Sequence, residues 1–326
     1  MLARVLVLLL FLVPVAWATA ALWFDGPTSR PLAGFLAVGF AAAALGGLML
    51  PASRLRGAAI CVVLLAAVAA WWTRLEPSNE REWQRDVARL PSAEIDGDRL
   101  TIRNLRNFEY RSETDYTERW EERSYDLSQL VGADLYLCSW GSPYIAHTIM
   151  SWEFAGGEPL AVSIETRKET HEAYSAVRGF FRQFELYYVV ADERDVVRLR
   201  TNHRGDQCRL YHLTNPPEQA RAVLLDYLGE INRLAEAPEW YNAATHNCTT
   251  TIRHHAQNVG AGNPFDWRIL VNGSIDEMGY ERGTLDQGLP FAELREQSYI
   301  NPRAQAAGDA PDFSARIRDG LPGGHR

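Results

Sequence analysis

The sequence predicts an α+β protein, in which an N-terminal three-helix transmembrane segment is followed by a domain of strands and helices. Two observations carry this prediction. Three apolar stretches without a charged residue open the 326-residue chain. The remainder, about 250 residues, is polar and suits one globular domain, and short alternating runs and longer runs of helical period both occur in it.

The three apolar stretches cover about residues 5–24, 32–50 and 57–73. A spanning helix needs roughly 20 apolar residues, with about 17 as the lower limit, so the first two qualify and the third lies near the limit. A cleaved signal peptide is the alternative for the first stretch, because Ala18-Thr19-Ala20 resembles a cleavage site. Both interpretations leave the C-terminal part on the outer side of the membrane.

Basic residues set the predicted orientation. Arg54 and Arg56 lie between the second and third stretches, and Arg4 precedes the first. Under the positive-inside rule, these residues face the cytoplasm. Trp71 and Trp72 close the third stretch, where an aromatic belt is expected. Everything after residue 73 is therefore predicted to lie outside.

Composition excludes several classes of function. The net charge is −8, and the outer domain shows no basic stripe of the kind that binds nucleic acid. None of the histidines stands at a recognisable zinc-binding spacing from a cysteine or a second histidine. We expect no nucleic-acid partner, no metal and no cofactor.

Cys248 is the most informative residue. It stands in the run Thr245-His246-Asn247-Cys248-Thr249, where Asn247 is a good N-cap and Gly260 ends the helical pattern. A thiol at a helix N-terminus meets the positive end of the helix dipole, which favours the reactive thiolate. The alternative is an inert core thiol. We interpret Cys248 as a nucleophile.

The other cysteines are assigned by position. Cys61 lies in the third apolar stretch and is expected to serve packing, whereas Cys138 and Cys208 are exported. An oxidising compartment permits a Cys138–Cys208 bridge that would leave Cys248 free, but the sequence leaves this bridge open.

The outer domain divides into recognisable elements. We expect a linker helix over residues 76–92, a main domain over 93–302 and a disordered tail over 303–326. Within the domain, residues 145–154 and 160–167 predict a hairpin around Gly156-Gly157. Pro216-Pro217 precedes a predicted helix over 218–235.

A thiol enzyme needs a base and a group that orients it. His147 is the predicted base, although a histidine among apolar strand residues is by default a core residue. Glu165 is the predicted third group, and Ser163 and Glu185 are alternatives; charged strand residues otherwise face water. His246 lies too close to the cysteine in sequence for a good in-line base. The predicted substrate-lining residues surround the cysteine: Asn247, Thr249, His246 and Tyr241.

Five segments in fixed order resemble the bacterial Lnb N-terminal periplasmic domain family: AHT (146–148), SIETRKE (163–169), GFFRQFEL (179–186), ADERDV (191–196) and NCTT (247–250). The likeness spans roughly residues 104–307. It implies a circularly permuted relative of papain-like and NlpC/P60 proteins, with the cysteine helix packed on a small antiparallel sheet and a His147–Cys248 pair. Together with the three apolar stretches, the resemblance predicts a multi-pass protein of the bacterial inner membrane whose C-terminal domain is periplasmic. One branch of the family moves an acyl chain onto the N-terminal cysteine of lipoproteins.

Three hypotheses of function follow. The first is a membrane-anchored thiol acyltransferase or hydrolase that acts on lipid or lipoprotein acyl groups. The second is a cysteine amidase or peptidase acting on cell-wall peptide. The third is a catalytically silent binding domain. Aliphatic lining near Cys248 favours lipid, a cleft of carboxylates and amides favours peptide, and an unreactive Cys248 favours the silent domain.

Overall fold

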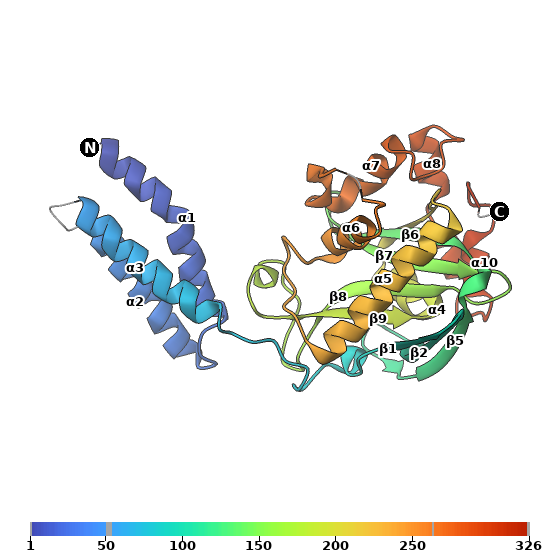
Figure 1. The fold of residues 1–326 in the computed structure, drawn as a ribbon, viewed down its shortest axis with the longest axis horizontal. Helices are drawn as coiled ribbons and strands as arrows, with labels where there is room; N and C mark the ends of the chain where they lie inside the picture. Colours follow the sequence, from blue (N-terminus) through green and yellow to red (C-terminus); the bar gives the residue numbers. More distant parts are fainter. Residues whose placement is uncertain (1, 50–53, 263, 325–326) are drawn as a thin grey trace. The chain divides into compact units, whose positions relative to one another are not determined.

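The computed structural model describes residues 2–49, 54–262 and 264–324 (Figure 1). The chain divides into two compact units. The helical unit comprises Met1–Ser78 and Ala173–Glu185, and the sheet unit comprises Asn79–Glu172 and Leu186–Arg326. The segment Ala173–Glu185 is therefore inserted in the sequence of the sheet unit but belongs to the helical unit.

The helical unit contains α1 (Leu2–Phe24), α2 (Arg30–Met49) and α3 (Arg54–Trp72). Among the described residues, two helical stretches are long and apolar enough to cross a membrane, Arg30–Met49 and Leu55–Trp72, and Leu10–Phe24 is a shorter apolar helix. Side chains of all three helices share one apolar cluster, which includes Val15, Phe40 and Cys61. Three helices are thus found where the sequence predicts them, and Cys61 serves packing.

The predicted linker helix over residues 76–92 is wrong. The only helical piece in this stretch is a 3-10 turn, Arg85–Val87. The stretch is held as an extended strap, because the Gln84 N–H donates to the Lys168 carbonyl and the Arg167 guanidinium donates to the carbonyls of Val87 and Ala88. Charged residues that look like a helix surface in the sequence instead make tertiary contacts.

The sheet unit is built on a mixed eight-stranded sheet rather than the small antiparallel sheet that the resemblance implies. The strand order is β1-β2-β9-β8-β7-β6-β10, and β5 pairs with β2. The bounds are β1 Ser92–Asp96, β2 Arg99–Arg106, β5 Trp120–Asp126, β6 Leu130–Ser139, β7 Ala146–Phe154, β8 Leu160–Arg167, β9 Glu185–Ala191 and β10 Gln207–His212. A separate pair contains β3 (Glu109–Tyr110) and β4 (Tyr116–Thr117). One pairing in the large sheet, β2 with β9, is parallel.

Helices cover both faces of the sheet. The long helix α5 (Pro217–Glu236) crosses one face, together with α6 (Cys248–Asn258) (Figure 1). The opposite face is covered by α4 (Glu193–Arg198), α9 (Asn301–Ala307) and α10 (Phe313–Arg318). Two short helices, α7 (Ile275–Glu281) and α8 (Phe291–Gln297), lie in the connection from α6 to α9. The predicted helices over 218–235 and from Cys248 are confirmed, as is the predicted hairpin, which forms β7 and β8.

The prediction of a disordered tail over 303–326 is wrong for residues 303–324, and residues 325–326 lie outside the described part of the chain. Residues in this range form most of α9 and all of α10, and the side chains of Phe313 and Ile317 are fully buried. They join an apolar cluster with Tyr136 and Ile149 of the sheet. The tail has little hydrophobic periodicity because only a few side chains face the core, and glycine and proline separate its short helices.

The structure also settles the cysteine pairing. Cys138 of β6 and Cys208 of β10 stand directly opposite each other in the antiparallel ladder and are joined by a disulfide. Cys248 is a free thiol. The bridge ties β10 to the strand that pairs with β7.

Candidate active site

Helix α6 begins where the sequence places it. The Asn247 side chain accepts hydrogen bonds from the backbone N–H groups of Thr249 and Thr250, and the Thr250 hydroxyl accepts one from the Asn247 N–H. This reciprocal capping fixes the first turn and places Cys248 as its first residue. Gly260 follows with a left-handed φ of 74° that other residues rarely adopt. The thiol is 8% exposed.

The start of α6 meets the sheet where two strands separate. β7 and β8 pair from Trp152–Leu160 to Ile149–Ser163, and the ladder ends there although both strands continue. The Cys248 sulfur lies 3.8 Å from the Thr249 Oγ1 and 3.9 Å from the Asn272 Nδ2, and Thr148, just beyond the last pair, helps to lower the pKa of the thiol. Cys248 therefore lies against β7 at the opening of the sheet.

His147 lies beside this opening and is hydrogen-bonded to Cys248. Its Nε2 is 2.6 Å from the Ser163 Oγ and 3.1 Å from the Glu165 Oε1. Because Nε2 is engaged by residues of β8, we assign Nδ1 to the thiol. The structure therefore brings Cys248, His147 and Glu165 together, in that order.

Glu165 is itself held by an arginine that sequence reasoning missed. Arg200 Nη2 donates to Glu165 Oε1 at 2.8 Å, and Arg200 Nη1 donates to Asp206 Oδ2 at 3.1 Å. Arg200 lies on a π-helical turn, Leu199–Arg204, an irregularity that is frequent at functional sites. Five arginines between residues 194 and 209 look alike in sequence, so no local signal identifies Arg200.

The charges of the three groups depend on one another. Burial tends to raise the pKa of Cys248, but His147 and the donors of Thr148 lower it to about 6. Burial and Arg200 tend to lower the pKa of His147, yet Glu165 and Cys248 raise it above its ordinary value. Burial opposes ionisation of Glu165, but His147 and Arg200 bring the pKa of this carboxyl well below its ordinary value. The arrangement favours a thiolate–imidazolium pair near neutral pH.

Asn272 is a further residue that the sequence did not reveal. Its amide accepts from the Ala146 N–H at 2.8 Å and donates to the Ala146 carbonyl at 2.6 Å and to the Thr249 hydroxyl at 2.7 Å. It thus joins the neighbour of His147 to the neighbour of Cys248. A Cβ on the next residue, Gly273, would lie 2.0 Å from the Pro143 carbonyl oxygen, so only glycine permits this approach. The only sequence signal is an Asn-Gly pair, which usually indicates a turn.

The other predicted residues have different positions. Thr249 is buried and bonded to Asn272, and the Asn247 amide is occupied by capping. His246 is exposed and bonded to the Thr245 hydroxyl, and Tyr241 is buried in the loop before α6. Glu185 accepts from the Ser78 N–H within the helical unit and is therefore not the orienting group for His147.

Two polar groups near the thiol have no acceptor among the described residues. One is the Cys248 backbone N–H, which lies before the first intrahelical hydrogen bond of α6. The other is the hydroxyl of Tyr227, which is fully buried on α5 and interacts electrostatically with Cys248. An unpaired donor beside a nucleophile is a position where negative charge can be stabilised.

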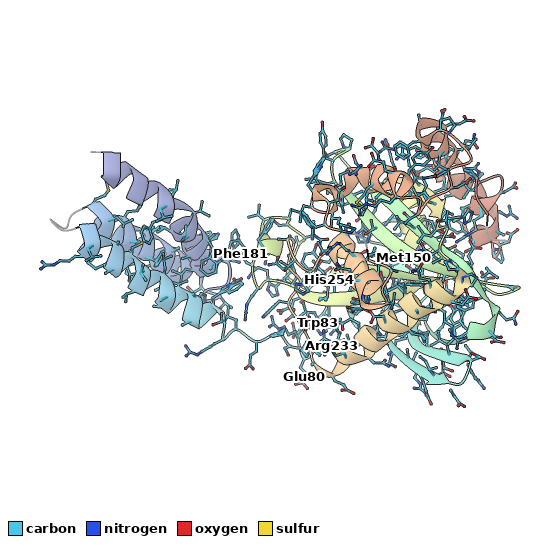
Figure 2. The ribbon with its side chains drawn as sticks, turned by 45° about the horizontal axis from the view of Figure 1, so that its top comes forward. Glu80, Trp83, Met150, Phe181, Arg233 and His254 are labelled. Carbon is cyan, nitrogen blue, oxygen red and sulfur yellow. A yellow bond between two sulfur atoms is a disulfide. The ribbon has the colours of Figure 1, made fainter. Side chains whose placement is uncertain are left out.

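An apolar cavity of about 180 Å³ adjoins the helix. Thr249, Ile252 and Ala256 of α6 line it on one side, and Leu135 and Met150 of the sheet line another (Met150 is labelled in Figure 2). The remaining lining is mostly aliphatic, including Val223, Met278 and Leu285, with Arg253 and Arg282 among its few charged residues. Thr249, which lines the cavity, directly follows Cys248 in the chain.

One cluster in the described part of the chain has the composition of a metal site. Ligand atoms of Asp134, Glu153 and His212 lie within 4.8 Å of one another. However, the Arg318 guanidinium bonds both carboxylates, with Nη2 at 2.7 Å from Asp134 Oδ2. An arginine therefore already provides the positive charge. His212 itself is buried against Asp134.

A comparison with family models identifies a domain in this chain. Residues 116–273 match the model of the Lnb N-terminal periplasmic domain. The chain contains an Lnb N-terminal periplasmic domain. This match confirms the resemblance seen in the sequence, over a shorter range. The Lnb domain includes His147, Glu165, Arg200, Cys248 and Asn272, and its end at Gly273 coincides with the close approach to Pro143. No curated protein and no solved structure gives a significant match to the chain.

Proposed function

We propose that the protein is a membrane-anchored thiol acyltransferase or hydrolase, which acts on lipid or lipoprotein acyl groups in the bacterial periplasm. The observation that carries this proposal is the Cys248 thiol, whose pKa is lowered to about 6 while it is hydrogen-bonded to His147. A buried structural thiol has no such partner, and burial alone raises the pKa of a thiol. The apolar helices α2 and α3 would anchor the protein in the inner membrane.

The chemistry follows from the positions of the groups. The Cys248 thiolate attacks the ester carbonyl carbon, and the carbonyl π-electron pair moves to the oxygen. The tetrahedral intermediate collapses when the ester C–O bond breaks, and the His147 imidazolium gives its proton to the leaving alkoxide. This leaves an acyl-thioester on Cys248 and a free alcohol.

The second half returns the enzyme to its starting state. An amine or water attacks the thioester carbonyl, neutral His147 accepts its proton, and the C–S bond breaks to restore the thiolate–imidazolium pair. Glu165, fixed by Arg200, keeps the imidazole oriented in both halves. The unpaired Cys248 N–H is suited to hold the oxyanion.

The apolar cavity favours lipid over peptide as the substrate. An engineered apolar cavity of about 150 Å³ binds benzene, so about 180 Å³ accommodates several methylene groups. Each buried methylene contributes about 0.8 kcal/mol, which favours an acyl chain. A cell-wall peptide would instead require a cleft of amides and carboxylates, whereas the cavity that begins at Thr249 has mostly aliphatic walls.

Mass spectrometry of the full-length protein tests the proposal. After incubation with phospholipid and a diacylglyceryl lipopeptide, we expect an acyl adduct on Cys248 that neutral hydroxylamine removes. Cys248→Ala should lose the adduct and all acyl transfer, whereas the matched control Cys61→Ala should keep both, since Cys61 packs inside the helical unit. Acyl transfer at the wild-type rate by Cys248→Ala would contradict the proposal. Cleavage of cell-wall peptide without lipid turnover would favour the amidase, and an unreactive Cys248 would favour a silent domain.

A further inference from the structure

The segment Ala173–Glu185 follows β8, ends at the first residue of β9 and packs on the helices. Gln183 Nε2 donates to Asp25 Oδ1 at 2.7 Å and to the Phe24 carbonyl at 2.9 Å. The Arg182 N–H donates to Asp25 Oδ2 at 3.2 Å. Asp25 directly follows α1, so the segment is fixed to one end of the helical unit.

Aromatic contacts reinforce this attachment. The ring of Phe181, which is labelled in Figure 2, lies 5.0 Å from the ring of Phe24. The Arg182 guanidinium lies 4.4 Å from the ring centre of Trp72, and the indole N–H of Trp72 donates to Asp25 Oδ2 at 2.7 Å. The segment therefore contacts the end of α1 and the end of α3 together, at the place where these helices would leave a bilayer.

The outward side of the segment is apolar. Tyr174, Val177 and Phe180 are 51%, 59% and 49% exposed, although these residue types usually bury their side chains. Trp23, at the end of α1, is 43% exposed. Residues 173–184 also contain two arginines and no acidic residue. Aromatic side chains mixed with arginine are typical of the membrane interface, where rings lie at headgroup level and cations meet lipid phosphates.

We infer that residues 173–184 are a membrane-interface anchor that inserts Tyr174, Val177 and Phe180 into the headgroup–acyl boundary of the outer leaflet. This inference rests on the proposed membrane anchoring of α2 and α3. The partner of this anchor is an anionic phospholipid surface, because the segment contacts the ends of the helices and its only charged side chains are positive. Isolated exposed apolar residues need no explanation, but three in one short segment fixed to these helix ends do.

The anchor has a consequence for the catalytic strand. β8 carries Ser163 and Glu165 and ends at Arg167, six residues before Ala173. The sheet unit is therefore joined to the membrane by the chain that follows β8 and precedes β9, as well as by the chain that follows α3.

A fluorescent probe tests the anchor without using catalysis. The full-length chain with Cys61→Ala and Cys248→Ala carries Val177→Cys labelled with the polarity-sensitive dye NBD, in bilayers of phosphatidylethanolamine and phosphatidylglycerol. Interfacial segments lie about 5–10 Å into the headgroup–acyl boundary, so we expect blue-shifted emission and roughly twofold quenching by lipids with a shallow spin label. The matched control, Asp96→Cys at the exposed end of β1 in the sheet unit, should show neither.

Two further results sharpen this test. Gln183→Ala, which removes the contact with Asp25, should reduce the quenching of the Val177 probe. Two outcomes would overturn the inference. In the first, the Val177 probe has the same emission as the Asp96 probe. In the second, its emission is blue-shifted but lipid quenchers do not reach it, which would indicate that protein and not lipid surrounds the probe. Because the background lacks Cys248, these results are independent of whether the protein transfers acyl groups.

Discussion

Two buried histidines in the same sheet have nearly the same surroundings. His147 of β7 is bonded to Glu165 of β8, and Arg200 holds that carboxylate. His212 of β10 is bonded to Asp134 of β6 at 2.7 Å, and Arg318 holds that carboxylate. Each site therefore contains a histidine, a carboxylate from a neighbouring strand and an arginine.

The difference lies in what completes each cluster. At His147 the cluster is completed by the Cys248 thiol at the start of α6, and the backbone N–H of Cys248 is unpaired. At His212 the cluster instead includes Glu153 and Glu193, and Arg318 of α10 binds them together with Asp134. Burial and Asp134 raise the pKa of Glu153 to about 7. The first cluster is arranged to react, whereas the second fastens the C-terminal helix to the sheet.

The largest expected effect separates the two histidines. His147→Gln should reduce acyl transfer about 10²–10⁴-fold, the range that general base catalysis supplies, and the protein should remain folded. His212→Gln should leave the turnover of folded protein unchanged but lower the free energy of unfolding by about 1–3 kcal/mol, because a buried charged hydrogen bond is lost. Initial rates and thermal unfolding of both variants provide the measurement. An equal loss of activity in His147→Gln and His212→Gln would contradict the conclusion that only His147 takes part in catalysis.

An intermediate effect is expected at the orienting carboxylate. Glu165→Gln keeps the shape but removes the charge that raises the pKa of His147. The turnover number should fall on the order of 10–100-fold, less than for His147, because Glu165 does not transfer the proton itself. The alkaline limb of the pH–rate profile should also move to lower pH, since the imidazolium loses its proton more readily. An unchanged pH profile would show that Glu165 does not act through His147.

The smallest effect is expected at Asn272, which positions the two reacting residues and donates to the Cys248 sulfur at 3.9 Å but transfers no proton. Asn272→Ala leaves the N–H and carbonyl of Ala146 without their partners, at a cost of about 1–3 kcal/mol in unfolding free energy. The rate of acyl transfer should fall about 10-fold, because a small displacement of the reacting atoms is costly. Asn272→Asp, which can still accept from Ala146 but adds a negative charge, should raise the pKa of Cys248. A wild-type rate and pKa in both variants would exclude the positioning role.

The sequence predicted the local parts of this architecture well. The N-cap Asn247 and the alternating hairpin of β7 and β8 are short-range signals, and the structure contains both elements at the expected places. Glu165 could be proposed because a hairpin brings residues on its two strands together. The family resemblance supported the same pair of elements, and the family match includes both of them.

Long-range contacts were not predictable in the same way. Arg200 and Asn272 reach the site from segments whose sequence shows only charge or a turn signal. His212 stands among charged residues in the sequence, which is typical of the surface, but Arg318 from more than 100 residues away compensates the buried carboxylates beside it. For the same reason the C-terminal residues looked disordered, although Phe313 and Ile317 pack into the core.

The pH dependence of Cys248 alkylation tests the central claim most directly, because it reports the thiolate itself. The rate of reaction with iodoacetamide, followed by mass spectrometry, should rise with pH around a midpoint of about 6 in the native protein. In His147→Gln the midpoint should move upward, since burial then acts on the thiol without its cationic partner. A midpoint near 9 in the native protein, unchanged by His147→Gln, would contradict the account.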